Sequence, residues 1–240
     1  MAGIYRNQPA KNDGMPSRIS TVLFDLDDTL VDSYTARVQA LEGVFSAGNI
    51  LSPTAEEFLR NLRGGQFEQA LNELEATEDR ILDLFGGYRR SYWSKGPGSI
   101  RLYPGIRSVI EELQAHGIKL GIVTQKGWAF DLEGRNVGAS QELLELGIAN
   151  LFSTGVGFES VSKHKPHPEG IFLALDRLRA HTRETIVVGD SLADMEAAQA
   201  AGCWSCHAVW GVPITERDLG SIEVDMVAEI PNALLKLPLV

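Results

Sequence analysis

Three aspartates directly after an apolar stretch are the residues of this sequence best placed to do chemistry. Residues 19–24 are rich in β-forming side chains and predict a buried strand, and Asp25, Asp27 and Asp28 follow it. A buried strand that ends in carboxylates predicts a cation at its end, because an uncompensated charge is costly to bury. An ionised aspartate can also attack an electrophile such as phosphorus without a base to activate it.

Polar side chains also stand where later strands are predicted to end. One apolar stretch closes with a hydroxyl, another is followed by an acidic pair, and a lysine lies in a loop before a predicted helix. These residues are Thr124, Asp190, Asp194 and Lys165. Taken singly, the threonine could cap a turn, the acidic pair could begin a helix, and the lysine could lie in a solvated loop. Their common order and placement instead predict that they meet Asp25 on one rim.

The elements that position these residues follow from the hydrophobic pattern. From Tyr103 onward, apolar stretches alternate with helical patterns, which predicts strands joined by helices and hence a parallel sheet. The predicted strands are 19–24, 118–124, 151–157, 185–189, 205–210 and 224–227. The predicted helices are 106–115, 137–146, 167–180, 192–201 and 232–237. The predicted fold class is α/β, with a Rossmann-like parallel sheet whose ligands bind beyond the carboxyl ends of the strands.

A helical block separates the first strand from the rest of this core. Its predicted helices are 34–47, 53–62, 67–74 and 78–93. Residues 95–98 (Lys-Gly-Pro-Gly) predict a linker after them. We therefore predict a helical cap domain over 32–100 and a core domain over 19–31 and 101–240. Residues 1–18 are polar, with Pro, Asn and Gly, and predict a disordered N-terminal extension.

Four motifs in this order resemble those of the haloacid dehalogenase-like (HAD) phosphohydrolases. The motifs are Asp25-Leu26-Asp27-Asp28-Thr29, Thr124, Lys165-Pro166 and Gly189-Asp190 to Asp194. The resemblance spans the core from Thr21 to about Trp210. The helical block looks like the cap of the subgroup that contains phosphoglycolate phosphatase and β-phosphoglucomutase. Lys163 is a rival for the motif lysine, but the Pro166 that follows Lys165 favours Lys165.

By this resemblance Asp25 is the nucleophile. The side chain of Asp27 protonates the leaving oxygen and then activates the water that cleaves the acyl-phosphate. Thr124 and Lys165 hold phosphoryl oxygens. The resemblance also implies Mg²⁺, which prefers hard oxygen ligands. The residues expected to hold it are Asp25, Asp27 through its backbone carbonyl, Asp190, and Asp194 directly or through water.

The resemblance implies a Mg²⁺-dependent phosphatase that hydrolyses a small phosphorylated metabolite through an aspartyl-phosphate. Asp27 favours phosphoryl transfer over carbon–halogen cleavage, because the dehalogenases lack an Asp two residues after the nucleophile. A phosphomutase acting on a sugar phosphate is the first alternative, since only the acceptor would differ. A non-catalytic binding module on the same scaffold is the second, and the complete motif set argues against it. Asp28 stands where many members have Gly, and we expect it to serve the turn.

Substrate selection is expected to fall to the cap. Residues 63–66 match the loop that joins two cap helices in capped relatives, often with Gly after a basic residue. Arg63 and Gly64 are therefore candidate substrate-binding residues; the alternative is a helix C-cap with a solvated arginine. Tyr34 and Arg37, soon after the first motif, are further candidates.

Residues 126–136 make the spacing between the second and third motifs longer than expected for the subgroup. They predict a surface loop, or a segment whose side chains reach the cap or a dimer partner. The side chains in question are Trp128, Phe130 and Arg135.

Composition bounds the partners and the compartment. The net charge of −10 argues against nucleic acid or an acidic membrane surface as a partner. Two cysteines exclude a disulfide framework and fit a reducing compartment. Cys203 and Cys206 lack the second pair of ligands that a zinc site needs, and a structural role is predicted for them. The expectation is a cytoplasmic enzyme, monomer or homodimer, that acts on a small phosphorylated molecule.

Overall fold

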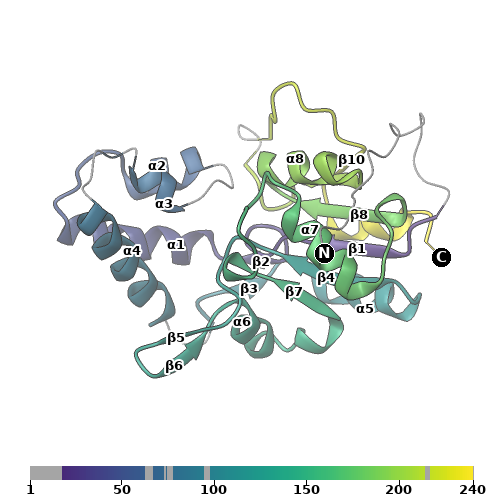
Figure 1. Ribbon diagram of the computed structural model, residues 1–240, viewed down its shortest axis with the longest axis horizontal. Helices are drawn as coiled ribbons and strands as arrows, with labels where there is room; N and C mark the ends of the chain where they lie inside the picture. Colours follow the sequence, from purple (N-terminus) through teal and green to yellow (C-terminus); the bar gives the residue numbers. More distant parts are fainter. Residues whose placement is uncertain are drawn as a thin grey trace.

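The computed structural model describes residues 18–62, 67–72, 74, 78–94, 98–213 and 217–239. The expected N-terminal extension, apart from Arg18, lies outside the described residues, and so do Arg63 and Gly64. Figure 1 shows a core built on a sheet, with the helices α1 to α4 gathered to one side of it.

The core is a six-stranded sheet in the order β10-β9-β8-β1-β4-β7, and every neighbouring pair in it is parallel. The strands are β1 (Thr21–Phe24), β4 (Lys119–Val123), β7 (Thr154–Val156), β8 (Thr185–Gly189), β9 (Trp204–Ala208) and β10 (Met226–Ala228). The predicted α/β class with a parallel sheet is confirmed.

The first strand of the core is also its central strand. Phe24 at the end of β1 pairs with Ile122 of β4 on one side and with Val188 of β8 on the other. Asp25 therefore leaves the sheet between two strands that end beside it. Because all three strands run in the same direction, the residues that follow them emerge at one edge.

Both faces of β1 are covered, which explains its unbroken apolar sequence. Val22 and Phe24 pack in the cluster that includes α5, α6 and η5, and Leu23 packs in the cluster that includes α7 and α8. The covering helices are α5 (Ile106–Ala115), α6 (Ala139–Glu145), α7 (Glu169–Leu178), α8 (Leu192–Ala201) and the 3-10 helix η5 (Pro231–Lys236). The last of these was predicted as an ordinary helix over 232–237.

The helices inserted after β1 form the cap. They are α1 (Tyr34–Ala47), α2 (Ala55–Leu62), α3 (Phe67–Asn72) and α4 (Glu78–Trp93). The cap has its own apolar cluster, in which Leu41 and Phe45 of α1 are buried with Phe58 of α2. The rings of Phe45 and Phe58 meet edge to face at 5.5 Å. None of the helices in the described ranges is long and apolar enough to cross a membrane.

Helix α2 begins two residues later than predicted. The expected start was Pro53, with Ser52 as the N-cap, but the helix begins at Ala55. Thr54 supplies the cap: its hydroxyl accepts a hydrogen bond from the Glu57 N–H, and the Glu57 carboxylate accepts one from the Thr54 N–H. This reciprocal capping box outweighs the local preference of proline for a first helical position.

Two short antiparallel strands lie where the chain leaves the core and where it returns. They are β2 (Val31–Asp32) and β3 (Arg101–Leu102), and neither was predicted. The Arg101 guanidinium also donates to the Asp32 carboxylate at 2.9 Å. Both crossings between cap and core therefore run side by side, and we propose that the domain boundary lies at this pair.

The segment 126–136 is not only a surface loop. It contains most of a hairpin formed by β5 (Phe130–Leu132) and β6 (Arg135–Val137). Glu133 and Gly134 form its two-residue turn with φ of 55° and 80°, the left-handed pair that such a turn requires. Because Glu-Gly is a weak hairpin signal beside Asn-Gly or Asp-Gly, the pattern was missed, and the helix expected from Val137 begins at Ala139.

We predict that Gly155→Ala lowers the free energy of unfolding by about 1–3 kcal/mol, the usual effect of overpacking a core. A Cβ atom at Gly155 on β7 would lie 1.8 Å from the Trp128 ring, so the indole at the base of the hairpin would have to move. Urea denaturation measures the change.

Gly43→Ala is the matched control. Gly43 lies on the exposed side of α1, and a Cβ atom there would meet nothing within 4 Å. This substitution should raise the free energy of unfolding by about 0.5–1 kcal/mol through helix propensity. An unchanged denaturation midpoint for Gly155→Ala would show that the Trp128 packing is not as described.

Candidate active site

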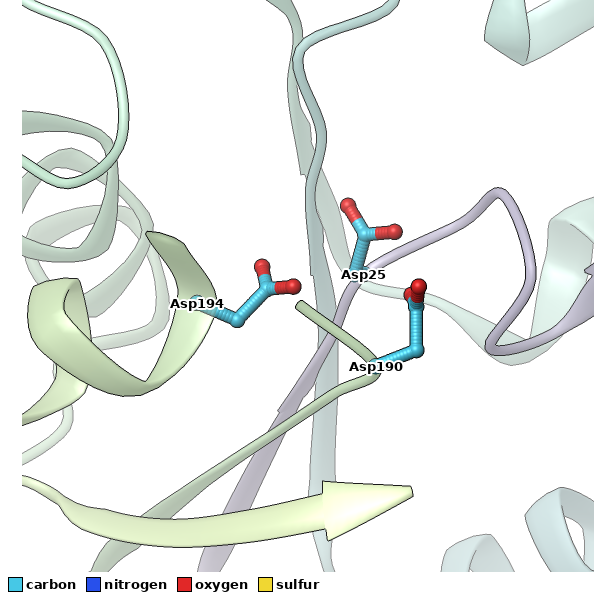
Figure 2. A group of neighbouring side chains, drawn as sticks. All are labelled: Asp25, Asp190 and Asp194. Carbon is cyan, nitrogen blue, oxygen red and sulfur yellow. The ribbon is translucent and has the colours of Figure 1, made fainter. Parts of the chain in front are cut away.

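Six of the predicted site residues, Asp27 among them, line one cavity of about 1220 Å³, which residues of the cap also line. Asp25, Thr124 and Asp190 follow the carboxyl ends of β1, β4 and β8. Asp194 comes from the first turn of α8, and Lys165 from the loop before α7. Figure 2 shows Asp25, Asp190 and Asp194 gathered at this edge of the sheet.

Lys165 is buried between two of these carboxylates. Its Nζ donates to Asp25 Oδ1 at 2.6 Å, to Asp194 Oδ1 at 2.5 Å and to the Val123 carbonyl at 3.2 Å. These contacts use all three N–H bonds of the ammonium group, so its position is fixed. Lys163, the rival in the sequence, is exposed. Lys165 is thus the one of the two lysines that reaches the acidic cluster.

Asp194 both completes the capping box at the start of helix α8 and binds the lysine. Its Oδ2 accepts hydrogen bonds from the Ser191 backbone N–H at 3.1 Å and from the Ser191 hydroxyl at 2.5 Å. Its Oδ1 faces Lys165. The sequence offered a helix N-cap and a site residue as alternatives for this motif. In the structure the Asp194 side chain contacts the N-cap residue Ser191 and also the site residue Lys165.

The acidic cluster has unfavourable electrostatics without a cation. Burial raises the pKa of Asp25 to about 7; Lys165 opposes the shift, whereas Asp194 adds to it. Burial also raises the pKa of Asp190 well above its usual range, and Asp28 and Asp25 nearby add to this shift. The ionised forms of Asp25 and Asp190 are therefore disfavoured more by burial and by neighbouring carboxylates than Lys165 can offset.

The donor set of this cluster fits a hard divalent cation. Asp25, Asp190 and Asp194 each offer one carboxylate oxygen, and these oxygens lie within 4.8 Å of one another. Carboxylate oxygens are the ligands preferred by Mg²⁺ and Ca²⁺. A bound cation would favour the ionised carboxylates, and so oppose the burial and the repulsion that raise the two pKa values.

Asp190 is held by residues from three parts of the core. The Thr29 hydroxyl donates to Asp190 Oδ1 at 2.8 Å, and the Trp210 indole N–H donates to the Thr29 carbonyl at 2.8 Å. His207 Nε2 lies 3.1 Å from the Asp190 carbonyl and donates to it. The threonine of the first motif thus orients the acidic residue of the last.

Asp27 lies in a different environment, which the sequence did not reveal. Its Oδ1 accepts hydrogen bonds from the Ser33 hydroxyl at 2.5 Å and from Lys126 Nζ at 2.7 Å. Burial raises the pKa of Asp27, but Lys126 and Arg37 outweigh it and leave the pKa below its usual range. Lys126 carried only a weak signal, its place two residues after Thr124.

Asp28 serves the turn, as expected. Its φ is 61°, in the left-handed region that glycine adopts most readily, and its N–H donates to the Val31 carbonyl at 2.8 Å. Its carboxylate pairs with Arg37 of α1. This pairing occupies one of the two further substrate candidates, although Arg37 and Tyr34 both line the cavity.

The hairpin reaches the cap through two of the three predicted side chains. Phe130 packs edge to face on Trp93 of α4 at 6.0 Å, and the Arg89 guanidinium lies 3.7 Å from the centre of the Phe130 ring. Arg135 donates to the Trp93 carbonyl at 3.4 Å. Trp128 instead packs against the core. The prediction that this segment reaches the cap is confirmed for Phe130 and Arg135.

Comparison with known proteins agrees with this geometry. Residues 22–208 match the family model described as haloacid dehalogenase-like hydrolase. The chain belongs to this family. It is 32% identical to pyrophosphatase PpaX of Oceanobacillus iheyensis, over 88% of this chain and 92% of that protein. It is 34% identical to phosphoglycolate phosphatase of Yersinia pseudotuberculosis, over 77% and 78%.

A solved structure of a hydrolase of the haloacid dehalogenase-like family from Streptococcus pneumoniae superimposes with a TM-score of 0.74. It is 27% identical to this chain, and the match covers 90% of this chain and 97% of that one. The protein is accordingly an enzyme of the HAD phosphohydrolase type, with a helical cap over a parallel sheet.

The two cysteines of this hydrolase lie away from the cavity lining. Both are buried and neither forms a disulfide, and burial raises the pKa of the Cys206 thiol to about 12. A thiol so shifted is neither a ready nucleophile nor a ready metal ligand. The predicted structural role of Cys203 and Cys206 agrees with this burial.

We predict that a divalent cation stabilises the folded hydrolase through the acidic cluster. Mg²⁺ at 100 times its Kd should add about 2.7 kcal/mol to the free energy of unfolding, because the unfolded chain lacks the site. Asp190→Asn should lose most of this gain, and thermal unfolding with and without Mg²⁺ measures it. Asp176→Asn, on an exposed position of α7, should keep the whole gain. Equal gains in both variants would place the cation elsewhere.

We also predict a pH-dependent stability in EDTA. Because the folded pKa of Asp25 is raised from 3.8 to about 7, the folded protein retains a proton that the unfolded chain loses between these values. Stability from this group is present at low pH and falls as pH rises through that window, by up to about 1.4 kcal/mol per pH unit.

Asp25→Asn removes this titration. The free energy of unfolding of this variant minus that of the unaltered protein should therefore be larger at pH 8 than at pH 4.5. Urea denaturation at the two pH values measures the difference, with Asp176→Asn as the surface control. A relative stability that is the same at both pH values would contradict the raised pKa.

Proposed function

We propose that the protein is a Mg²⁺-dependent phosphatase that hydrolyses a small phosphorylated metabolite through an aspartyl-phosphate. The observation that carries this proposal is how Asp25 is held. Lys165 binds Oδ1, no donor from the described residues contacts Oδ2, and the side chain lines the cavity. A carboxylate fixed through one oxygen, with the other open to the cavity, suits attack on phosphorus.

The first step forms a bond from Asp25 Oδ2 to phosphorus as the bond from phosphorus to the leaving oxygen breaks. Asp27, which lies two residues further along the chain and lines the same cavity, gives a proton to that oxygen. In the second step water attacks the phosphorus, Asp27 takes its proton, and the Asp25 carboxylate is restored as phosphate leaves. One carboxylate acts as nucleophile and its neighbour transfers the proton.

Two further residues act on the phosphoryl oxygens. The charge of Lys165 offsets the negative charge of Asp25 and of the approaching phosphoryl group. Thr124 Oγ1 already accepts a hydrogen bond from the Lys126 backbone N–H at 3.1 Å, which leaves its own proton for a phosphoryl oxygen.

The metal would be held by Asp25, Asp190, the backbone carbonyl of Asp27, and Asp194. A bound Mg²⁺ supplies positive charge that reduces the repulsion between the carboxylate and the phosphate dianion. Asp194 contributes charge to this cluster while it also anchors Lys165.

Two relatives suggest the substrate class. A phosphoglycolate phosphatase and a pyrophosphatase are among the proteins most like this chain. Phosphoglycolate and pyrophosphate are small, and each carries a second anionic group beside the scissile phosphate. We propose that Arg63 and Gly64 of the cap contribute to binding that second group.

A phosphate-release screen tests the proposal. Phosphorylated sugars, 2-phosphoglycolate, nucleotides and pyrophosphate are offered with Mg²⁺ and with EDTA. We expect Mg²⁺-dependent release from at least one small substrate. Asp25→Asn should lower kcat by about three orders of magnitude or more, because removal of a covalent nucleophile leaves only binding and electrostatic effects.

The control for this screen is Asp176→Asn, which should keep full activity. Circular dichroism confirms that each variant is folded. Retention of most activity by Asp25→Asn would refute its role as nucleophile. Isomerised sugar phosphate without free phosphate would instead identify a phosphomutase.

A further inference from the structure

We propose that Lys126 is a positioning residue that orients Asp27 toward the substrate, and that it does so in contact with the cap through Tyr92 of α4. The proposal rests on the proposed phosphatase function, in which Asp27 transfers the proton. It adds a residue outside the four motifs, and it connects the seating of the cap with the alignment of the proton donor.

Lys126 lies at the centre of a closed set of hydrogen bonds. Its Nζ donates to Asp27 Oδ1 at 2.7 Å, to Glu142 Oε2 of α6 at 2.8 Å and to the Tyr92 hydroxyl at 2.9 Å. The Tyr92 hydroxyl in turn donates to Glu142 Oε1 at 2.7 Å. The side chain of Lys126 is only 10% exposed. All three N–H bonds of the ammonium group are therefore used within the protein.

This arrangement determines which oxygen of Asp27 faces the reaction. Lys126 and the Ser33 hydroxyl both bind Oδ1. No donor from the described residues contacts Oδ2, and Asp27 lines the cavity. Two donors on one oxygen prevent the carboxylate from rotating, so that Oδ2 remains the oxygen that exchanges a proton with the substrate.

The same arrangement includes the cap. Tyr92 lies in the last turn of α4, where its hydroxyl contacts Lys126 and its ring centre lies 4.8 Å from Nζ. The ring of Trp93 lies 5.6 Å from Nζ. A cap that moves away from the core would take both aromatic rings and the hydroxyl with it. Lys126 would then keep only its two carboxylate partners, Asp27 and Glu142.

Glu142 explains why the hydroxyl of Tyr92 matters. It is a second carboxylate on the same lysine, buried to 5% side-chain exposure, and it competes with Asp27 for the ammonium group. The hydrogen bond that the Tyr92 hydroxyl donates to Glu142 compensates part of the cost of burying that carboxylate. The ammonium group can then stay between the two carboxylates, rather than moving toward Glu142.

A purely structural role is the competing explanation, since a buried lysine between two carboxylates also neutralises charge. The two explanations differ in their dependence on the leaving group. If Asp27 no longer protonates the leaving group, hydrolysis slows for a substrate with a basic alkoxide leaving group. Hydrolysis of a substrate whose leaving group needs no proton keeps its rate. A loss of folded enzyme lowers both activities equally.

The test compares p-nitrophenyl phosphate, whose leaving group is a weak base, with 2-phosphoglycolate, whose leaving group is a strong one. Lys126→Met should lower kcat for 2-phosphoglycolate at least about tenfold more than for p-nitrophenyl phosphate. Tyr92→Phe keeps the ring and removes the hydroxyl. It should change the ratio in the same direction, by about threefold.

Two further variants make the test independent of folding and of cap docking in general. Lys126→Met with Glu142→Gln removes a charge from each side and leaves no unpaired Glu142 carboxylate, so it should fold and show the same change in ratio. Arg135→Ala removes a different contact to the end of α4, the bond to the Trp93 carbonyl. Its ratio should stay that of the unaltered enzyme.

Equal losses on both substrates in the Lys126 variants would overturn the proposal and leave the structural role. A changed ratio in Arg135→Ala would assign the effect to cap docking as a whole, which also overturns it. Failure of the proposed function gives a different result: the unaltered enzyme would release phosphate from neither compound, or Asp25→Asn would be as active as the unaltered enzyme.

Discussion

Repulsion among carboxylates at the end of a buried strand is the constraint on which the rest of this structure depends. Burial raises the pKa of Asp25 to about 7 and that of Asp190 well above its usual range, and the nearby Asp194 carboxylate raises both further. The surrounding elements relieve this repulsion. Lys165 takes two of the carboxylates, the Thr29 hydroxyl supports Asp190, and the first turn of α8 supports Asp194. A bound cation would stabilise the ionised carboxylates further.

Two aspartates only two residues apart lie in opposite electrostatic environments. The pKa of Asp25 is raised, because burial outweighs its share of Lys165. The pKa of Asp27 is lowered, because Lys126 and Arg37 outweigh burial. The turn after β1 separates the two environments, since it places Asp25 in the acidic cluster and Asp27 beside Lys126. A cation held by the cluster would lower the pKa of Asp25 and favour its ionised form.

The sequence predicted what depends on local order. The hydrophobic pattern predicted the end of β1, the strand β8 and the helices α5 and α8. The common edge of a parallel sheet predicted that four residues converge, which are Asp25, Thr124, Lys165 and Asp190. What it did not predict depends on contacts between distant segments. The role of Lys126 depends on its hydrogen bonds to Glu142 and Tyr92, which lie 16 and 34 residues away in the chain. The hairpin over 130–137 was missed because its Glu-Gly turn is a poor local signal.

The central position of β1 has a consequence for how the chain acquires its fold. This strand is made first, yet both of its neighbours, β4 and β8, belong to the part of the core that follows the cap in the chain. The contacts that complete the cluster join residues 140 positions apart, from Asp25 to Lys165, and 161 apart, from Thr29 to Asp190. Such separations give a high contact order, and contacts of this kind form slowly. A nascent chain therefore carries Asp25 on an apolar strand that lacks its second neighbour until β8 is complete, while the helical cap can fold earlier on its local contacts.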